Sequence, residues 1–135
     1  MQLQVRDWMI DLLVFIEPES TVSEALALMR RRYIHSLVVR KSKEFPESGI
    51  ITSTDICDKI IAEEQNPVAI RVHEIMTSPV ITVSRDSTLK ECSQLMKKHN
   101  IHHLPVADEN GELVGMISAS DFLVAAESLV TDVPA

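Results

Sequence analysis

The sequence is poor in aromatic residues, cysteine and positive charge. Aromatic residues make up 4% of the 135 positions, so a core has to be built from Val, Ile, Leu, Met and Ala. The two cysteines, Cys57 and Cys92, have no CxxC spacing and cannot form a disulfide scaffold, which predicts reduced thiols in a cytoplasmic protein. The net charge of −7 argues against broad nucleic-acid binding, although it leaves room for one local basic pocket.

Long apolar runs and the common enzyme motifs are also missing. No run approaches the ~20 residues that span a bilayer. The first eleven residues carry Arg6, Asp7 and Asp11 and do not resemble a signal peptide, so we expect no membrane partner. The patterns GxxxxGK[ST], GxGxxG and GxSxG do not occur. We therefore expect a protein that is not an enzyme and has no catalytic residues.

The chain repeats itself after 66 or 67 positions. Equivalent pairs at a shift of 67 include Val5 with Val72, Met9 with Met76, Thr21 with Thr88, His35 with His102 and Val39 with Val106. At a shift of 66, Gly49 aligns with Gly115 and Asp55 with Asp121. The offset changes in segments 40–48 and 107–114, as expected of loops. We place the repeats at 1–66 and 67–135 and expect each to bury an apolar face against the other.

Each repeat predicts the order β-α-β-β-α, which is an α/β (α+β) class. In the first repeat we expect strands near 12–16, 34–39 and 49–52 and helices over 21–32 and 53–65, with a linker at 68–76. In the second repeat we expect strands over 80–83, 103–106 and 113–118 and helices from Thr88 to Lys98 and over 119–129. Capping-box spacings at Thr21 and Thr88 begin the first helix of each repeat.

Several motifs resemble those of CBS domains. The segments at Gly49–Asp55 and Gly115–Asp121 read Gly-Ile-Ile-Thr-x-x-Asp and Gly-Met-Ile-Ser-x-x-Asp, and both are similar to the closing signature of that family. The stretch from His73 to Val80 resembles the opening of a CBS domain, and Asn100–Val106 resembles its central strand. The resemblance covers nearly the whole chain in two copies.

This resemblance implies a pseudo-twofold CBS pair, also called a Bateman module, with regulatory function. Such modules bind adenosine-containing ligands in clefts between the repeats: AMP, ADP, ATP, S-adenosylmethionine or NAD. They usually dimerise and regulate a fused or separate partner protein. We therefore expect a homodimer with an adenosine nucleotide as regulatory ligand, no required cofactor, and a regulated protein that the sequence does not name.

Two hydroxyl–aspartate pairs are the first candidates for ligand contact. Thr52 with Asp55, and Ser118 with Asp121, stand where a strand passes into a helix, and a carboxylate there can accept hydrogen bonds from a ribose diol. The alternative is that the hydroxyl residues cap their helices and the carboxylates favour the helix dipole. Recurrence in both repeats, together with the resemblance, favours ligand contact for at least one copy.

The histidines provide the next candidates. His35 and His102 are equivalent, and the family resemblance implies a phosphate contact for both, whereas the alternative is a strand histidine with a backbone partner. His99, His102 and His103 lie close in sequence, but no carboxylate or thiol is spaced to complete a zinc site, so we expect no metal. The basic helix ends at 30–32 and 97–98 are either dipole-complementing termini or phosphate contacts.

The second copy carries the better predicted site. Pro79 and Val80, with Pro105 and its neighbours Leu104 and Val106, would offer backbone groups and apolar walls to an adenine ring. His103 is a further ligand-binding candidate of this copy. The first copy departs from this pattern, because Leu13, Ser36 and Val38 stand at the equivalent positions.

Two other hypotheses stay open beside the ligand sensor. One is a ligand-free dimerisation or interaction module, for which the helices over 53–65 and 119–129 are the candidate faces. The other is an enzyme, since Ser118, His102 and Asp121 contain the residue types of a catalytic triad, but no nucleophile elbow accompanies them.

Overall fold

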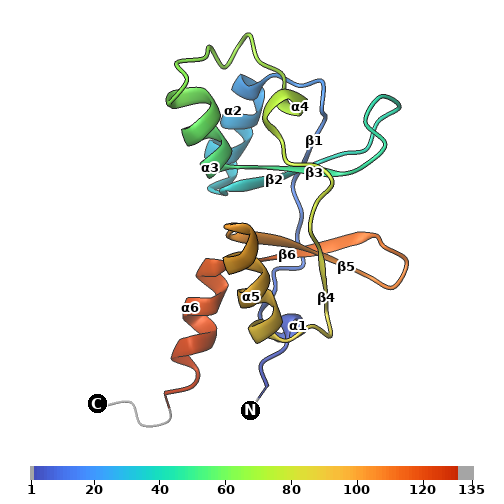
Figure 1. Cartoon of the computed structure of the whole chain (residues 1–135), viewed down its shortest axis with the longest axis vertical. Coiled ribbons are helices and arrows are strands. Elements are labelled where there is room, and N and C mark those ends of the chain that lie inside the picture. The colour runs from blue at the N-terminus through green and yellow to red at the C-terminus, as the bar shows by residue number, and fades with distance from the viewer. Residues whose placement is uncertain (1, 131–135) are drawn as a thin grey trace. The chain divides into compact units, whose positions relative to one another are not determined.

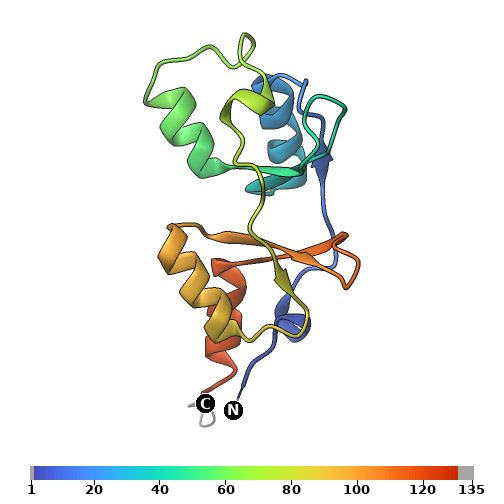
Figure 2. The ribbon, with the colours of Figure 1, turned by 45° about the vertical axis from the view of Figure 1, so that its right-hand side comes forward.

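The computed structural model describes residues 2–130, which fall into two compact units. The first unit is Val14–Val80, and the second joins segments 1–13 and 81–135. Within each unit, helices pack on one face of a three-stranded sheet (Figures 1 and 2). The expected α+β class of two β-α-β-β-α repeats is confirmed.

The first unit contains one repeat in the predicted order. Its elements are β1 (Phe15–Ile16), α2 (Val22–Arg32), β2 (Ser36–Val39), β3 (Gly49–Thr52), α3 (Ser53–Asp55), the π-helix η1 (Ile56–Ile61) and α4 (Val72–Ile75). The central strand β2 is parallel to β1 and antiparallel to β3.

The second unit repeats this arrangement. Its elements are α1 (Val5–Trp8), β4 (Val83–Ser84), α5 (Leu89–His99), β5 (His103–Ala107), β6 (Leu113–Ser118) and α6 (Ala119–Glu127). The central strand β5 is parallel to β4 and antiparallel to β6. Figure 1 shows α5 and α6 on the same side of the β5–β6 ribbon.

Both predicted capping boxes are present. The Thr21 hydroxyl accepts from the Glu24 N–H at 3.1 Å, and the Thr88 hydroxyl accepts from the Glu91 N–H at the same distance. Since these bonds satisfy backbone groups that a helix start leaves open, they explain why α2 and α5 begin where the sequence predicts.

The cores are aliphatic, as the composition requires. Each unit has its own cluster, with Leu37, Ile51 and Val39 central in the first and Leu104, Ile117 and Val106 central in the second. Cys92 is buried in the second cluster, whereas Cys57 is exposed on η1. Core packing is the usual environment of a free cysteine on a helix face, and Cys57 departs from it.

The opening segments of the two repeats are exchanged between the units. Val5 donates its backbone N–H to the Ser87 carbonyl at 2.9 Å, and the equivalent Val72 donates to the Ser20 carbonyl at 2.8 Å. Both valines are fully buried, each in the core that contains the other repeat's helices. The compact units, 14–80 and 1–13 with 81–135, therefore do not coincide with the sequence repeats at 1–66 and 67–135. The repeats describe how the sequence is duplicated, and the units describe how the chain packs.

Three of our boundary predictions are wrong. The strands expected over 12–16 and 80–83 are shorter than predicted: only Phe15–Ile16 forms β1, and only Val83–Ser84 forms β4. Both are edge strands that pair with the central strand of their sheet through two residues each. The predicted linker at 68–76 contains α4, and α1 was not predicted. Four-residue helices are too short to show a 3.6-residue periodicity.

The helix predicted over 53–65 is also not a plain α-helix. After α3 the chain forms η1, whose wider turns place Ile60 in the core and leave Lys59 at the surface. In α6 the buried position is Ala125, which is equivalent to Lys59 at a shift of 66. The π-helix therefore moves the buried face by one residue relative to α6. The helix α6 itself ends at Glu127, two residues before the predicted end.

Candidate functional site

The first strand-to-helix junction brings three predicted residues together. Thr52 ends β3, and its N–H donates to Asp55 Oδ2 at 2.9 Å, while the Asp55 N–H donates to the Thr52 hydroxyl at 3.4 Å. The N–H of Ser53, the next residue, donates to the His35 carbonyl at 3.0 Å. His35 therefore lies directly beside the helix start, with its side chain exposed.

The second junction has the same construction. The Ser118 N–H donates to Asp121 Oδ2 at 2.8 Å, and the Ala119 N–H donates to the His102 carbonyl at 3.0 Å. His103 pairs directly with Ser118 across the β5–β6 ladder. Pro105 is buried two residues further along β5.

The two aspartates differ in what else they contact. Asp55 is 8% exposed, and its Oδ1 lies 2.9 Å from Lys59 Nζ. Asp121 is half-buried, and within residues 2–130 its recorded side-chain bonds all run through Oδ2. Our alternative interpretation expected the hydroxyls to cap these helices, and the Thr52 hydroxyl does accept from the Asp55 N–H. Beyond that interpretation, both carboxylates also accept the N–H of the residue at the N-cap of their helix.

Val80 falls in a different unit from the other residues predicted for the second copy. It is the last residue of the first unit, whereas His102, His103, Pro105, Ser118 and Asp121 all belong to the second. It also precedes the strand in which we expected it, since β4 begins at Val83.

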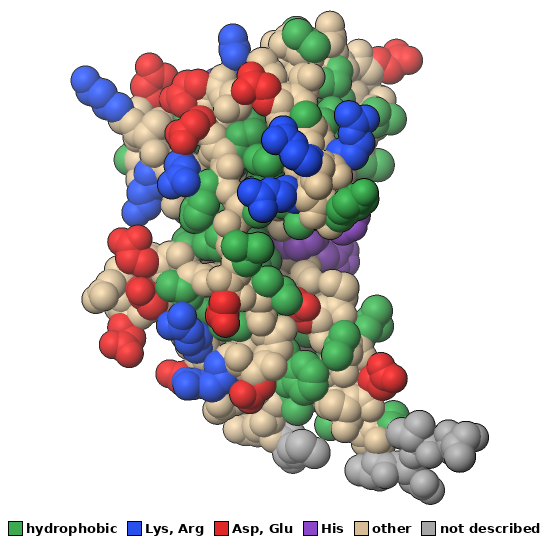
Figure 3. Space-filling view, turned by 180° about the vertical axis from the view of Figure 1, so that it is seen from behind, with side chains coloured by type: hydrophobic (Ala, Val, Ile, Leu, Met, Phe, Trp, Pro, Cys, Tyr) green, Lys and Arg blue, Asp and Glu red, His purple; other side chains and the backbone are tan. Residues whose placement is uncertain are grey.

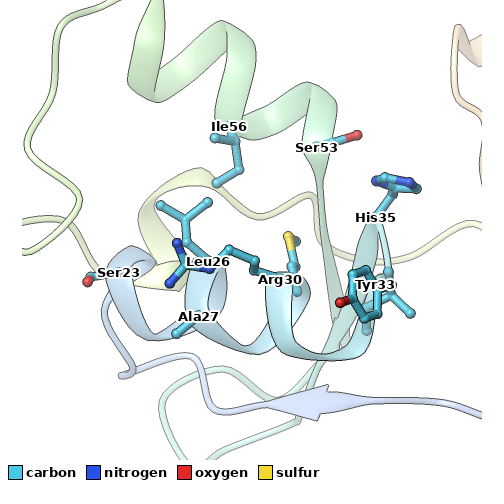
Figure 4. A pocket seen from close by; sticks show the side chains of 10 residues that line it. Ser23, Leu26, Ala27, Arg30, Tyr33, His35, Ser53 and Ile56 are labelled. Carbon is cyan, nitrogen blue, oxygen red and sulfur yellow. The ribbon is translucent and has the colours of Figure 1, made fainter.

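A groove of about 740 Å³ lies on the first unit between α2 and the helix formed by α3 and η1. Figure 4 shows Leu26 and Ile56 pointing toward each other from its two sides, with His35 and Ser53 at one end. Arg30, from the last turn of α2, lies along the groove. Cavities of this size hold ligands in many proteins.

The sequence interpretation missed most of the groove. Leu26, Tyr33 and Ile56 line it but matched no motif. Tyr33 ends α2 in the left-handed conformation with φ 55°, where the second repeat has Asn100, and its side chain is 90% exposed. A bulky residue at a position that favours Gly or Asn is the one signal that could have marked this end of the groove. Arg30 belongs to the basic helix end for which a phosphate contact was one interpretation.

Electrostatics single out one buried group. Burial, with a smaller contribution from the charge of Glu91, raises the pKa of the Cys92 thiol to about 11. On the face drawn in Figure 3, cationic and anionic side chains are interspersed with apolar ones. No group of three or more His, Cys, Asp or Glu within residues 2–130 is arranged to hold a metal ion, and no helix in that range is long and apolar enough to cross a membrane.

Comparison with known families identifies the chain. The CBS domain model matches residues 5–62 and 72–128, so the protein belongs to the CBS domain family and is a tandem CBS pair. An uncharacterised protein of Methanopyrus kandleri is 35% identical over 116 residues, which is 86% of this chain and 59% of that protein. A homoserine O-acetyltransferase of Methanococcus vannielii is 38% identical over 78% of this chain.

Solved structures share the fold. An uncharacterised protein of Pyrococcus horikoshii is 29% identical, with a TM-score of 0.81 over 100% of this chain and 98% of that one. A hexameric CBS-CP12 protein from bloom-forming cyanobacteria is 33% identical, with a TM-score of 0.84 over 91% of this chain and 67% of that one. A CBS domain pair in complex with 5′-methylthioadenosine and S-adenosylmethionine is 25% identical, with a TM-score of 0.81 over 96% and 99% of the two chains.

The enzymes among the relatives match only in part. This chain spans 21% of the length of the acetyltransferase and 21% of an inosine-5′-monophosphate dehydrogenase of Korarchaeum cryptofilum. The matched part is the CBS pair, so the similarity concerns this module and carries no catalytic residues across.

Proposed function

We propose that this CBS pair is a regulatory module that binds an adenosine-containing nucleotide and transmits its occupancy to a partner protein. The candidate ligands are AMP, ADP, ATP, S-adenosylmethionine and NAD. The protein would act in the cytoplasm as a homodimer, with the nucleotide as a regulatory ligand in place of a resident cofactor. A ligand changes such a module only through different affinities for its conformations.

The observation that carries this proposal is the repeated junction. In each unit a hydroxyl residue, an aspartate and a histidine converge where a strand passes into a helix. Vicinal ribose hydroxyls are suited to donate to such a carboxylate, and bonds to charged acceptors are the stronger kind. Lys59 occupies Oδ1 of Asp55, whereas the hydrogen bonds of the Asp121 side chain within residues 2–130 run through Oδ2. This difference supports the second junction as the tighter site.

Two further observations support a small adenosine compound. A CBS pair of the same fold was solved with 5′-methylthioadenosine and S-adenosylmethionine. The groove beside His35 offers apolar walls to a purine ring and the Arg30 guanidinium to a phosphate.

The test is ligand-induced thermal stabilisation, followed by titration calorimetry, with AMP, ATP, NAD and S-adenosylmethionine. At a hundredfold excess over Kd, a ligand that binds the folded state alone adds about 2.7 kcal/mol to the free energy of unfolding. We expect a rise in melting temperature with at least one ligand, and loss of most of that rise in Asp121→Ala.

Glu91→Ala is the matched control. Glu91 occupies the same third position of a capping box as Asp121, but on α5, away from the junction. Both variants lose about 1 kcal/mol of stability from the cap. Only Asp121→Ala should lose the ligand-dependent part, and equal ligand effects in the two variants would reject Asp121 as a contact. No response to any of the four ligands would reject the sensor.

A second candidate function is a ligand-free interaction module. The observation in its favour is the apolar surface of α6, where Leu123 is 74% and Val124 58% exposed. Sedimentation of the wild type and of the double variant Leu123→Ser, Val124→Ser distinguishes the two. An assembly that dissociates in the variant, combined with no nucleotide response in the wild type, would favour this function.

A further inference from the structure

Lys59 connects the first junction to the segment that joins the repeats. Its ammonium lies 2.9 Å from Asp55 Oδ1 and donates to the carbonyl of Ile75 at 2.7 Å. Ile75 is the last residue of α4, sixteen residues further along the chain. One side chain on η1 therefore holds both the capping carboxylate and the end of α4.

The π-helix makes this arrangement possible. It puts Ile60 in the core and leaves Lys59 on the side that faces Asp55 and α4. The second repeat has Ala125 at the equivalent position, buried in a regular α-helix, so the connection belongs to the first repeat alone. π-turns within helices are frequent at functional sites.

Other acidic residues line the same surface hollow as Lys59. A hollow of about 340 Å³ is lined by Lys59 together with Asp58, Glu63 and Glu74. The side chain of Lys59 is 43% exposed and that of Asp55 only 11%. Asp55, the residue paired with Lys59, is buried, whereas Asp58, Glu63 and Glu74 are exposed. A pair with one buried member is less weakened by salt than a fully exposed one.

The end of α4 is held by backbone hydrogen bonds to α4 itself and to β3. The Met76 N–H donates to the Val72 carbonyl at 3.0 Å, and the Thr77 N–H donates to the Ile50 carbonyl at 2.9 Å. These two amides follow directly after the carbonyl that Lys59 binds. Their exchange rates therefore report whether that end of α4 is held.

We propose that Lys59 is a positioning residue that couples occupancy of Asp55 to the end of α4. A hydroxyl that donates to Asp55 Oδ1 competes with the ammonium for the same oxygen and so weakens its hold on Ile75. By reciprocity, releasing Lys59 changes the affinity for that hydroxyl. The ligand part of this coupling rests on the function proposed above, whereas the Asp55–Lys59–Ile75 connection does not.

The first experiment uses the ligand-free protein and hydrogen exchange at Met76 and Thr77. Lys59→Met keeps the aliphatic stem, and Asp55→Asn keeps one acceptor oxygen for the cap while removing the charge that Lys59 pairs with. We expect about fivefold to tenfold faster exchange in both, the effect of losing one charge-assisted hydrogen bond. Lys59→Arg should restore wild-type rates. Asp121→Asn, the equivalent change in the second repeat, should leave them unaltered.

Unchanged exchange in both Lys59→Met and Asp55→Asn would overturn the coupling, as would an equal acceleration in Asp121→Asn.

The second experiment measures affinity for AMP, ATP, NAD and S-adenosylmethionine in an Asp121→Ala background, which isolates the first junction. There, Lys59→Met should change Kd at least threefold, and equal affinities would overturn the ligand part. If the wild-type protein binds none of the four ligands, the proposed sensing function is rejected. The hydrogen-exchange data still test the Asp55–Lys59–Ile75 connection independently.

Discussion

The backbone N–H of Val5 donates to the carbonyl of Ser87 at 2.9 Å, although the two residues lie in different sequence repeats. The same bond occurs between Val72 and Ser20 at 2.8 Å, so the exchange of opening segments is itself repeated. The opening segment of the first repeat, with Val5, completes the core of the second repeat, and the opening segment of the second, with Val72, completes the core of the first. The stability of each unit therefore depends on a segment distant in sequence.

The exchange predicts where a core mutation acts. Val5→Ala removes two buried methyl groups, which should lower the free energy of unfolding by about 1–3 kcal/mol. Hydrogen exchange should accelerate in α5 and β5, not in α2 and β2. Val72→Ala is the matched control and should show the reverse. Acceleration confined to the mutated residue's own repeat would contradict the exchange.

Two equivalent glycines should differ in tolerance. A Cβ on Gly115 would lie 2.5 Å from the Ile10 carbonyl oxygen and in contact with the Met9 side chain. On Gly49 it would lie 2.7 Å from Met76 Sδ, with the Thr77 carbonyl at 3.2 Å. A flexible side chain can move aside more easily than backbone. In urea unfolding, Gly115→Ala should cost about 2–4 kcal/mol and Gly49→Ala about 1–2 kcal/mol. Equal costs would contradict this reasoning.

The end of α2 offers a stabilising substitution. Tyr33 adopts φ 55°, a conformation that costs a bulky residue about 1–2 kcal/mol relative to glycine. Because its side chain is exposed, little packing is lost in Tyr33→Gly, and the melting temperature should rise. Tyr33→Asn, which copies Asn100 of the second repeat, should give a smaller rise. A lower melting temperature in both variants would show that the Tyr33 ring contributes more packing than its exposure indicates.

Thiol chemistry should separate the cysteines. Cys57 is exposed and should react rapidly with a thiol reagent at pH 8, whereas Cys92 should react only on unfolding. The folded state raises the pKa of Cys92 from 9.0 to about 11, so it binds that proton more tightly than the unfolded state does. Stability should therefore fall as the pH rises from about 9 to 11. Cys92→Ala should be less stable at neutral pH but should lose that part of the alkaline decline. An unchanged slope would exclude Cys92 as its source.

Much of the local structure could be predicted from the sequence. The Thr-x-x-Glu spacings at Thr21 and Thr88 predict helix starts, because capping uses atoms within four residues of each other. The duplication and the closing motifs likewise predict the family and the two junctions with Asp55 and Asp121. His35 and His102 lie beside those junctions because the strand that follows each histidine pairs with the strand that ends at the junction.

Other features depended on contacts that no local pattern encodes. The exchange of Val5 and Val72, the bond from Lys59 to Ile75 and the groove between Leu26 and Ile56 join residues that lie far apart in sequence. The π-helix, likewise, arises where packing Ile60 into the core outweighs regular α-helical spacing. Sequence by itself determined the repeated elements, because hydrogen bonding and periodicity act over a few residues. Tertiary packing alone decided which segment completes which core, because the free energy gained by burying an apolar side chain does not depend on its distance along the sequence.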